Sequence, residues 1–416
     1  MYIANKSASR LYFWVIWLLY SVVYMTKNCF TAAMASVVFE GIMTKSQVGF
    51  IVAAFYIVYA PLQVVSGVFA DKYRPERLII IGLCGGALAN LVLFLNRNYS
   101  VVLIVWIINA VFQSCIWPAV FKIVSSRIIY EDRANATFFI SIASTVGLML
   151  SYAVAALLPR WYYNFAVSSV SLLLFAVLFA IADRKSKAHM CPETETGSGL
   201  GNEKSTAQKT PSAAGLFLAS GFALLLLVVF LETLVGNSAR TFSSTMLMES
   251  YDHIPPAIGN YLNVLIIGFG VTTTVFIKCF LYPKRIKSAP VGILFTLIVA
   301  AVFSMLCALN KGQIFFAVLS LCVLSGVFSA VTLFASYCCL EFETFHKSGT
   351  MAGVLNGIIS AGLIVNNYGV TRIADHHGWQ AVSRLNVVLT VLAVFLTVAM
   401  IPLWKAFKKK YGLSGA

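Results

Sequence analysis

Long stretches without charged residues set the main constraint on how this chain can fold. About 20 apolar residues are needed for a helix to cross the hydrocarbon core of a bilayer, and runs of that kind recur twelve times. They lie at residues 11–36, 48–70, 78–95, 101–124, 136–158, 163–183, 214–247, 257–281, 289–309, 313–338, 350–371 and 381–404. The pattern predicts an all-α membrane protein with twelve transmembrane helices.

The composition supports a membrane protein. Hydrophobic residues make up 60% of the chain and charged residues only 11%, whereas a soluble globular domain carries about 25% charged residues. The first span is too long for the apolar core of a signal peptide, and no small-residue cleavage site follows it. We therefore expect the first span to be retained as a helix.

The distribution of basic residues predicts the orientation. The net charge is +15, and about two thirds of the Lys and Arg residues fall in the termini, the central linker and the loops on one side of the predicted membrane, as in the positive-inside rule. We expect a multi-pass protein of the cell (inner) membrane with both termini cytoplasmic. Because the basic charge is explained by topology, no nucleic-acid partner is expected.

One polar segment divides the chain. Residues 184–213 are rich in Lys, Ser, Thr, Gly and Glu, a composition that cannot form a core and is typical of a flexible linker. It separates a six-helix half at residues 1–183 from a second half at residues 214–416, which ends in a basic cytoplasmic tail. Two halves of six spans indicate a pseudo-symmetric transporter with a substrate site near the membrane midplane.

Two charges deep inside apolar spans are the strongest functional clue. Lys27 lies about 24 Å from the start of the first span, and Glu232 about 27 Å from the start of the seventh, at a rise of about 1.5 Å per residue. Intramembrane charges are rare and usually functional. An ion pair between the two would lower the cost of burial. The pair is interpreted as a structural bridge, a proton site or a lock that the substrate breaks, and a snorkelling lysine is the remaining alternative.

Further polar residues join these two charges. Arg240 lies two turns beyond Glu232, either as an interface anchor or as a substrate contact. Uncharged polar residues also recur at helical spacing on four spans, where they line a polar path or hydrogen-bond between helices. They are Tyr20 and Tyr24 with Lys27, Tyr59 and Gln63, Asn109, Gln113 and Trp117, and Asn356, Ser360 and Asn367. The predicted substrate-binding residues are Lys27, Tyr24, Asn28, Gln113, Glu232, Arg240, Asn356 and Asn367.

The segment after the second span carries a family resemblance. It reads Gly67-Val-Phe-Ala-Asp71-Lys72-Tyr-Arg74-Pro-Glu-Arg77 and resembles the Gly-x-x-x-Asp-Arg/Lys-x-Gly-Arg-Arg loop of the major facilitator superfamily, except that Arg74 replaces a glycine. The Asp-Lys-x-x-Pro run is more similar to the organophosphate:phosphate antiporter (sugar-phosphate and glycerol-3-phosphate permease) branch. The resemblance implies gating or conformational roles for Gly67, Asp71, Lys72 and Arg77.

Three other stretches resemble the same branch. Tyr24-Met-Thr-Lys27-Asn28 is similar to its Arg-Lys-Asn-Phe run, Phe112-Gln113 with Trp117-Pro118 to its Phe-Gln-x-x-x-Trp-Pro pattern, and residues 347–353 to its Gly-Thr-x-x-Gly helix entry. In that branch two arginines and a histidine bind the substrate phosphate. Here Thr26 occupies the position of the first arginine, the histidine position falls near Ser144, and the second arginine aligns near Gly236. These departures weigh against an organophosphate substrate.

The predicted function is secondary active transport of a small, anionic organic solute by alternating access, as an antiporter or symporter. Coupling to a proton through Glu232 or to a counter-anion is expected, in a monomer embedded in the lipid bilayer. No phosphate-binding loop of the ATPase type occurs, and neither His376-His377 nor the nine cysteines show metal-ligand spacing, so no enzyme activity, cofactor or metal is expected. The alternative is a transporter-like membrane sensor that binds a metabolite and signals to a partner protein. A cation-selective drug exporter comes third, since only Glu232 would serve it.

Overall fold

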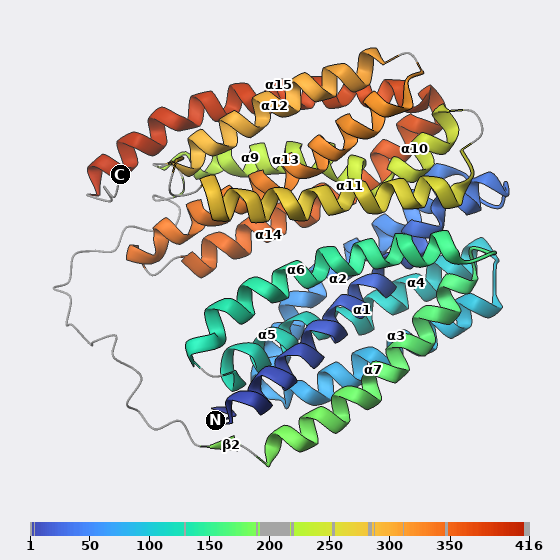
Figure 1. Cartoon of the computed structure of the whole chain (residues 1–416), viewed down its shortest axis with the longest axis vertical. Coiled ribbons are helices and arrows are strands. Elements are labelled where there is room, and N and C mark those ends of the chain that lie inside the picture. Colours follow the sequence, from blue (N-terminus) through green and yellow to red (C-terminus); the bar gives the residue numbers. More distant parts are fainter. Residues whose placement is uncertain are drawn as a thin grey trace. The chain divides into compact units, whose positions relative to one another are not determined.

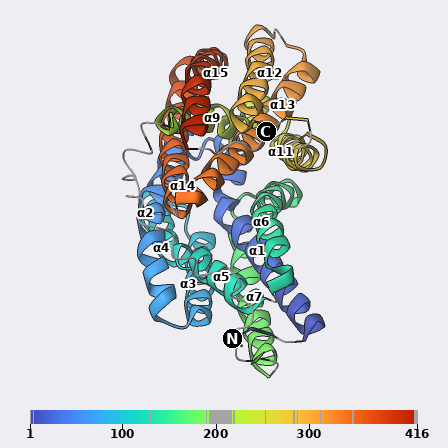
Figure 2. The same cartoon turned by 90° about the vertical axis from the view of Figure 1, so that its left-hand side faces the viewer.

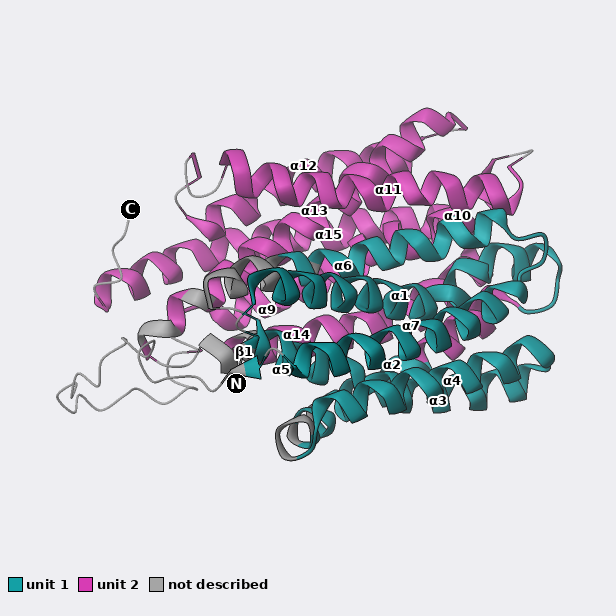
Figure 3. Ribbon diagram, turned by 60° about the horizontal axis from the view of Figure 1, so that its bottom comes forward, with its two compact units in different colours: residues 1–43, 54–205 teal, residues 44–53, 206–416 magenta. Residues whose placement is uncertain are grey.

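The computed structural model describes residues 2–3, 5–128, 130–188, 190–191, 217, 220–251, 254–281, 285–286, 288–310, 312–345 and 348–411. Nearly all of them are helical (Figure 1). Packing divides the chain into two compact units (Figure 3). Unit 1 consists of residues 1–43 and 54–205, and unit 2 of residues 44–53 and 206–416.

Unit 1 is built from seven helices in the described part of the chain. Helix α1 packs mainly against α6 and α7, and α3 packs against α7 and α4 (Figure 2). Strand β1 pairs with β2 in an antiparallel ladder of two residues each. The bounds are β1 Tyr2–Ile3, α1 Lys6–Phe39, α2 Lys45–Lys72, α3 Pro75–Leu95, α4 Tyr99–Ser114, α5 Ile116–Arg127, α6 Tyr130–Leu157, α7 Tyr163–Lys187 and β2 Met190–Cys191.

Local sequence signals explain where several of these helices begin and end. The side chain of Asn5 caps α1 by accepting hydrogen bonds from the backbone N–H groups of Ser7 and Ala8, which have no partner inside the helix. Pro75 opens α3, where its missing N–H costs nothing. The fourth predicted span is divided into α4 and α5 at Cys115, because Pro118 cannot donate the backbone hydrogen bond that would continue one helix through this point.

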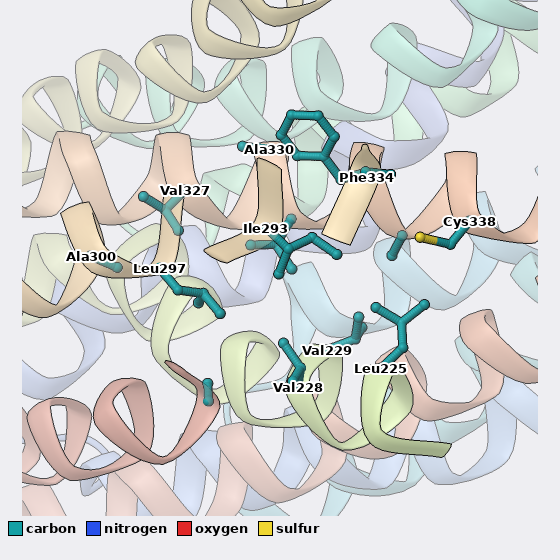
Figure 4. Packing of buried hydrophobic residues seen from close by; sticks show 14 of the residues in the cluster. Leu225, Val228, Val229, Ile293, Leu297, Ala300, Val327, Ala330, Phe334 and Cys338 are labelled. Atoms are coloured by element: carbon teal, nitrogen blue, oxygen red, sulfur yellow. The ribbon is translucent and has the colours of Figure 1, made fainter. Parts of the chain in front are cut away.

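Unit 2 packs around α9, α12 and α13. Val228 and Val229 of α9, Ile293 of α12 and Phe334 of α13 lie in one apolar cluster (Figure 4). The bounds are α9 Phe222–Thr241, α10 Ser243–Ser250, α11 Pro256–Phe276, η2 Ile277–Leu281, α12 Ala289–Leu309, α13 Ile314–Leu340, η3 Glu341–Phe345, α14 Ser348–Val365, η4 Asn366–Val370 and α15 Thr371–Lys410. The elements η2 and η4 are π-helical turns, and η3 is a 3-10 helix.

The predicted membrane helices are confirmed as a class. Ten helical stretches of the described residues are long and apolar enough to cross a membrane, and residues Ile142–Leu157 form a shorter apolar helix. One stretch, Gly353–Lys410, covers both the eleventh and the twelfth predicted span. It bends at Gly378, whose φ of 74° suits glycine because it has no Cβ.

Two boundaries differ from the predicted ones. Helix α7 continues to Lys187, so the first four residues of the predicted linker are helical, while most of the remaining linker lies outside the described residues. Residues 45–53, which form the first turns of α2, pack as part of unit 2, and the rest of the helix packs in unit 1.

Candidate functional site

Lys27 lies inside unit 1 in a cage of aromatic rings. Its side chain is 6% exposed. The ammonium nitrogen lies 3.7 Å from the ring centroid of Tyr59, 4.9 Å from that of Tyr56 and 5.0 Å from that of Tyr24. Phe55 stands further off at 5.8 Å. Within unit 1 no described carboxylate forms an ion pair with Lys27, so its partners there are the negative faces of uncharged rings.

The predicted stripe on α1 continues as a wall of aromatic rings. Tyr20 contacts Tyr24 at 5.1 Å and Trp117 of α5 at 4.8 Å between ring centroids. On α2, Gln63 donates a hydrogen bond of 2.7 Å to the Tyr59 hydroxyl. The predicted neighbours on one face therefore do meet, and the rings of α1 and α2 surround the lysine.

The amide side chains predicted to bind substrate in unit 1 differ in how many of their hydrogen-bonding atoms have partners. Asn28 donates to the Tyr24 carbonyl of its own helix at 2.8 Å. Gln113 donates to Asn109 at 3.2 Å. The carbonyl oxygen of Gln113 and the amide nitrogen of Asn109 are buried with no hydrogen-bond partner among the described residues. Two buried polar atoms without partners are costly, which makes this pair a better ligand candidate than Asn28.

Arg240 lies inside unit 2 in a cradle that fits its guanidinium group. Its Nε donates to Ser325 at 3.0 Å, and its Nη2 donates to Ser329 at 2.7 Å. The ring of Phe328 lies 4.9 Å from its guanidinium carbon. On α11, a Cβ at Gly270 would overlap Nη2, so only glycine leaves room for this rotamer. The arginine is 8% exposed, and every described partner of its side chain is uncharged.

Glu232 is the least satisfied charged group in the described residues of unit 2. It is 1% exposed, and neither carboxyl oxygen has a hydrogen-bond partner among the described residues. A buried carboxyl in this situation needs a proton, a cation or hydrogen-bond donors from a ligand. Lys27 belongs to unit 1 and Glu232 to unit 2; their predicted pairing stays a prediction.

The two predicted asparagines on α14 and η4 have different surroundings. Asn356 is exposed. Asn367 is buried in the π-helical turn, donates to the Leu363 carbonyl at 2.7 Å, and leaves its own amide oxygen without a partner among the described residues. Its neighbour Asn366 binds α9 instead: it donates to the Leu234 carbonyl at 2.6 Å. In this π-helical turn the side chains of Asn366 and Asn367 therefore have different hydrogen-bond partners.

The predicted gating residues lie around the end of α2 and the start of α3. Gly67, Asp71 and Lys72 belong to α2, and the side chains of Asp71 and Lys72 lie outside the described residues. Arg77 is exposed on α3. The gating roles of these four residues stay predictions.

A charged cluster beside these residues was missed from the sequence. Arg127 of α5 forms ion pairs with Glu76 of α3 and with Asp183 of α7, the latter at 2.6 Å. Tyr12 of α1 donates to Asp183 at 3.2 Å, and Lys187 pairs with the same carboxylate at 2.7 Å. Each charged residue lies at the end of an apolar span, and this position is visible in the sequence. Which residues pair with one another depends on the packing of the helices in unit 1.

A second missed cluster fixes the start of α2 within unit 2. Lys45 pairs with Glu249 at 2.8 Å and with Asp375 at 3.6 Å. The backbone N–H of Ser46 donates to Asp375 at 2.6 Å, and the Trp379 indole donates to Glu249 at 2.7 Å. These bonds connect the start of α2 to α10 and α15, in agreement with the placement of residues 45–53 in unit 2.

The fold and these buried charges are typical of membrane transport proteins. The family model of the Major Facilitator Superfamily matches residues 16–366. The chain therefore belongs to the major facilitator superfamily, a family of multi-pass membrane transport proteins rather than of enzymes.

Two curated relatives support the branch that the signature residues indicate. The membrane sensor protein UhpC of Escherichia coli (strain K12) is 26% identical over 149 residues, which are 35% of this chain and 34% of that protein. A probable hexose phosphate transport protein of Chlamydia trachomatis serovar D is 32% identical over 106 residues, 26% of this chain and 23% of that protein. The chain thus matches about a third or less of the length of these relatives.

Solved structures agree on the fold. A D-xylose-proton symporter matches with a TM-score of 0.71 at 15% identity, covering 97% of this chain and 99% of that chain. A mutant of the peptide transporter POT matches with a TM-score of 0.73 at 12% identity, covering 95% of each chain. At these identities the likeness concerns the fold alone.

Proposed function

We propose that this protein is a secondary transporter that moves a small organic anion across the membrane by alternating access. One observation carries the proposal: each unit buries a basic side chain whose described partners within that unit are all uncharged, Lys27 in unit 1 and Arg240 in unit 2. An unpaired charge inside a membrane protein costs several kcal/mol. Each ring or hydroxyl contact recovers about 1–2 kcal/mol of that cost, but none neutralises the charge. A negatively charged solute would supply the neutralising charge.

The character of the anion follows from what stands beside Lys27. Relatives named as hexose phosphate transport proteins match part of this chain, but the position of the branch's first phosphate-binding arginine is Thr26. That residue is fully buried and donates its hydroxyl to the Val23 carbonyl at 2.9 Å. Without that arginine the site carries one positive charge fewer than the site of the branch. This difference favours a singly charged oxyanion, such as a carboxylate, over a phosphate dianion.

Coupling is proposed to run through a proton or a counter-anion. Glu232 is the candidate proton carrier because its carboxyl is buried and has no described partner, and such a group exchanges a proton when its surroundings change. The protein is proposed to act as a monomer in the inner membrane, with both termini cytoplasmic.

Ligand-dependent thermal stabilisation of the purified protein tests the anion. A panel of organic anions, cations and neutral metabolites is added to the wild type and to Lys27→Met and Arg240→Gln. We expect selected carboxylates to raise the melting temperature of the wild type, with affinity reduced about tenfold or more in either variant, which corresponds to about 1.4 kcal/mol.

The matched control is Arg97→Gln. The guanidinium carbon of Arg97 also lies over an aromatic ring, 3.8 Å from the centroid of Tyr162, but Arg97 is exposed. This variant should bind as the wild type does. If Lys27→Met and Arg240→Gln both bind anions with wild-type affinity, or if only cations stabilise the protein, the proposal is wrong.

A membrane sensor is the second candidate function, because the relative UhpC is named as one. Uptake into proteoliposomes distinguishes the two. A transporter accumulates the anion that stabilises it, whereas a sensor binds that anion without moving it.

A further inference from the structure

Helix α9 carries two opposite charges that lack counter-ions among the described residues of unit 2. Glu232 and Arg240 stand eight positions apart, with Gly236 midway between them. All three positions fall within one quarter of the helix circumference, at about 100° per residue. Both charged side chains are more than nine tenths buried. We propose that the transported solute is zwitterionic, and that Arg240 binds its oxyanion while Glu232 binds a cationic group. This inference rests on the proposed transport function and narrows the organic anion to a solute that carries a cationic group beside its oxyanion. It assigns Glu232 to that group in place of a proton, which leaves the counter-anion as the coupling species.

The residues around Arg240 hold its guanidinium group in a fixed position that is suited to binding an oxyanion. Ser325, Ser329 and Phe328 of α13 hold the guanidinium group by two hydrogen bonds and one ring contact. Gly270 of α11 leaves the space that the group occupies. The two hydroxyls fix its orientation without neutralising it. A rigid arginine fork is the side chain that best matches the geometry of a carboxylate or phosphate.

The Glu232 carboxyl group requires a hydrogen-bond donor that the described residues do not supply. Both oxygens of Glu232 are buried and neither accepts a hydrogen bond from a described residue. Protonation alone would leave the second oxygen and the new O–H group without partners, because no described side chain bonds either position. An ammonium group offers a positive charge and three N–H donors, so it satisfies both oxygens in one contact.

On the face of α9 that carries the two charges, the position midway between them is Gly236, and its neighbour across the helix contact is apolar. A Cβ at Gly236 would overlap the Cβ of Phe328 and lie 2.7 Å from its Cγ, so the phenylalanine packs directly on this glycine. The same side chain contacts Arg240. The solute should therefore present a hydrocarbon or other weakly polar segment between its two charged ends.

The spacing bounds the length of that segment. Eight residues place the Cα atoms of Glu232 and Arg240 about 12 Å apart along the helix axis, and this rise is taken as the separation of the two charged groups. Contacts of about 3 Å at each end leave about 6 Å between the charged ends of the solute. Phe328 fills this face of α9 in the structure, so the proposal requires a state of the transport cycle in which Phe328 moves away from Gly236.

A matched ligand series tests the proposal. The probes are unbranched ω-amino carboxylates and ω-aminoalkyl phosphates with about three to six methylene groups, a range set by the separation of about 6 Å. Each probe is paired with the analogue that ends in a methyl group in place of the ammonium. Affinities are measured by calorimetric titration for the wild type, Glu232→Gln and Arg240→Gln. The carboxylate and phosphate arms show which oxyanion the arginine end accepts.

In the wild type, the best amino probe should bind about tenfold tighter than its methyl analogue, with an optimum at intermediate length. Glu232→Gln should abolish this preference while keeping the affinity for the methyl analogue. Arg240→Gln should weaken both probes. Glu232→Asp, which shortens the side chain by one methylene, should move the optimum to a longer probe. The control Glu40→Gln alters an exposed carboxylate at the end of α1 and should change neither affinity.

Several results would overturn the inference and leave anion transport standing. One is equal binding of amino and methyl probes to the wild type. Another is a Glu232→Gln effect of the same size on both members of a pair, which would assign Glu232 to proton exchange. A third is loss of the preference in Lys27→Met, which would assign Lys27 as the counter-ion of Glu232. If no anion of any kind binds the wild type, the proposed function itself fails.

Discussion

Substitution of Gly270 by alanine tests how tightly unit 2 holds the guanidinium group of Arg240. The added Cβ would overlap Nη2, and it would lie 2.8 Å from Oγ of Ser329 and 3.1 Å from Oγ of Ser325. Carbon atoms normally stand at least about 3.5 Å from such neighbours, so the guanidinium must move by about 1 Å. That movement breaks the 2.7 Å bond between Nη2 and Ser329.

The loss can be estimated from this one bond. A hydrogen bond to a charged group contributes about 1.5–3 kcal/mol, so anion affinity should fall about 10- to 100-fold. Calorimetric titration with an anion found in the thermal panel measures the change. The three atoms nearest to the added Cβ belong to Arg240, Ser329 and Ser325, so the loss should concern the anionic end of the ligand.

The matched control is Gly353→Ala in the same unit. An added Cβ at Gly353 meets no heavy atom within 4 Å, and an alanine in a helix is favoured by about 0.5–1 kcal/mol over glycine. This variant should bind the anion as the wild type does. Wild-type affinity in Gly270→Ala, with the protein folded, would refute a role for the cradle around Arg240.

Three other substitutions have expected outcomes in thermal or denaturant unfolding. Tyr59→Leu should lower the free energy of unfolding by about 1–2 kcal/mol, because it removes the nearest ring from Lys27, whereas Tyr59→Phe should retain most of it; equal effects of the two variants would argue against the cage. Asn366→Leu should destabilise the protein by about 2–3 kcal/mol by removing its side-chain bonds to α9, and no loss would show that the π turn is held by other contacts. Arg127→Gln leaves Glu76 without its arginine partner and should cost about 3 kcal/mol or more, with partial recovery in Arg127→Lys; an unchanged melting temperature would contradict a stabilising ion cluster.

Much of the fold is predictable from the sequence because the bilayer imposes it. Each membrane helix needs an apolar run of fixed length, and such runs are legible without any knowledge of tertiary contacts. The bend at Gly378 and the π turn at Asn366 were not predicted, since both depend on how α14 and α15 pack. The division of α2 was not predicted either, because it follows from ion pairs of Lys45 with residues about 200 or more positions away.

The candidate site was predictable in its charges but not in its partners. Lys27, Glu232 and Arg240 stand out because charges in apolar spans are rare. Tyr56, Phe328 and the two serines of α13 carry no such signal, because aromatic and hydroxyl residues are common in membrane helices. Which of them touches a buried cation depends on helix rotation and register.

Uptake of a stabilising anion into proteoliposomes tests the central claim most directly. Wild-type protein should accumulate the radiolabelled anion, and the double variant Lys27→Met/Arg240→Gln, reconstituted to the same density, should not exceed protein-free vesicles. Arg97→Gln should match the wild type. Accumulation by the double variant at the wild-type rate would contradict the account, because the two buried cations would then have no part in moving the solute.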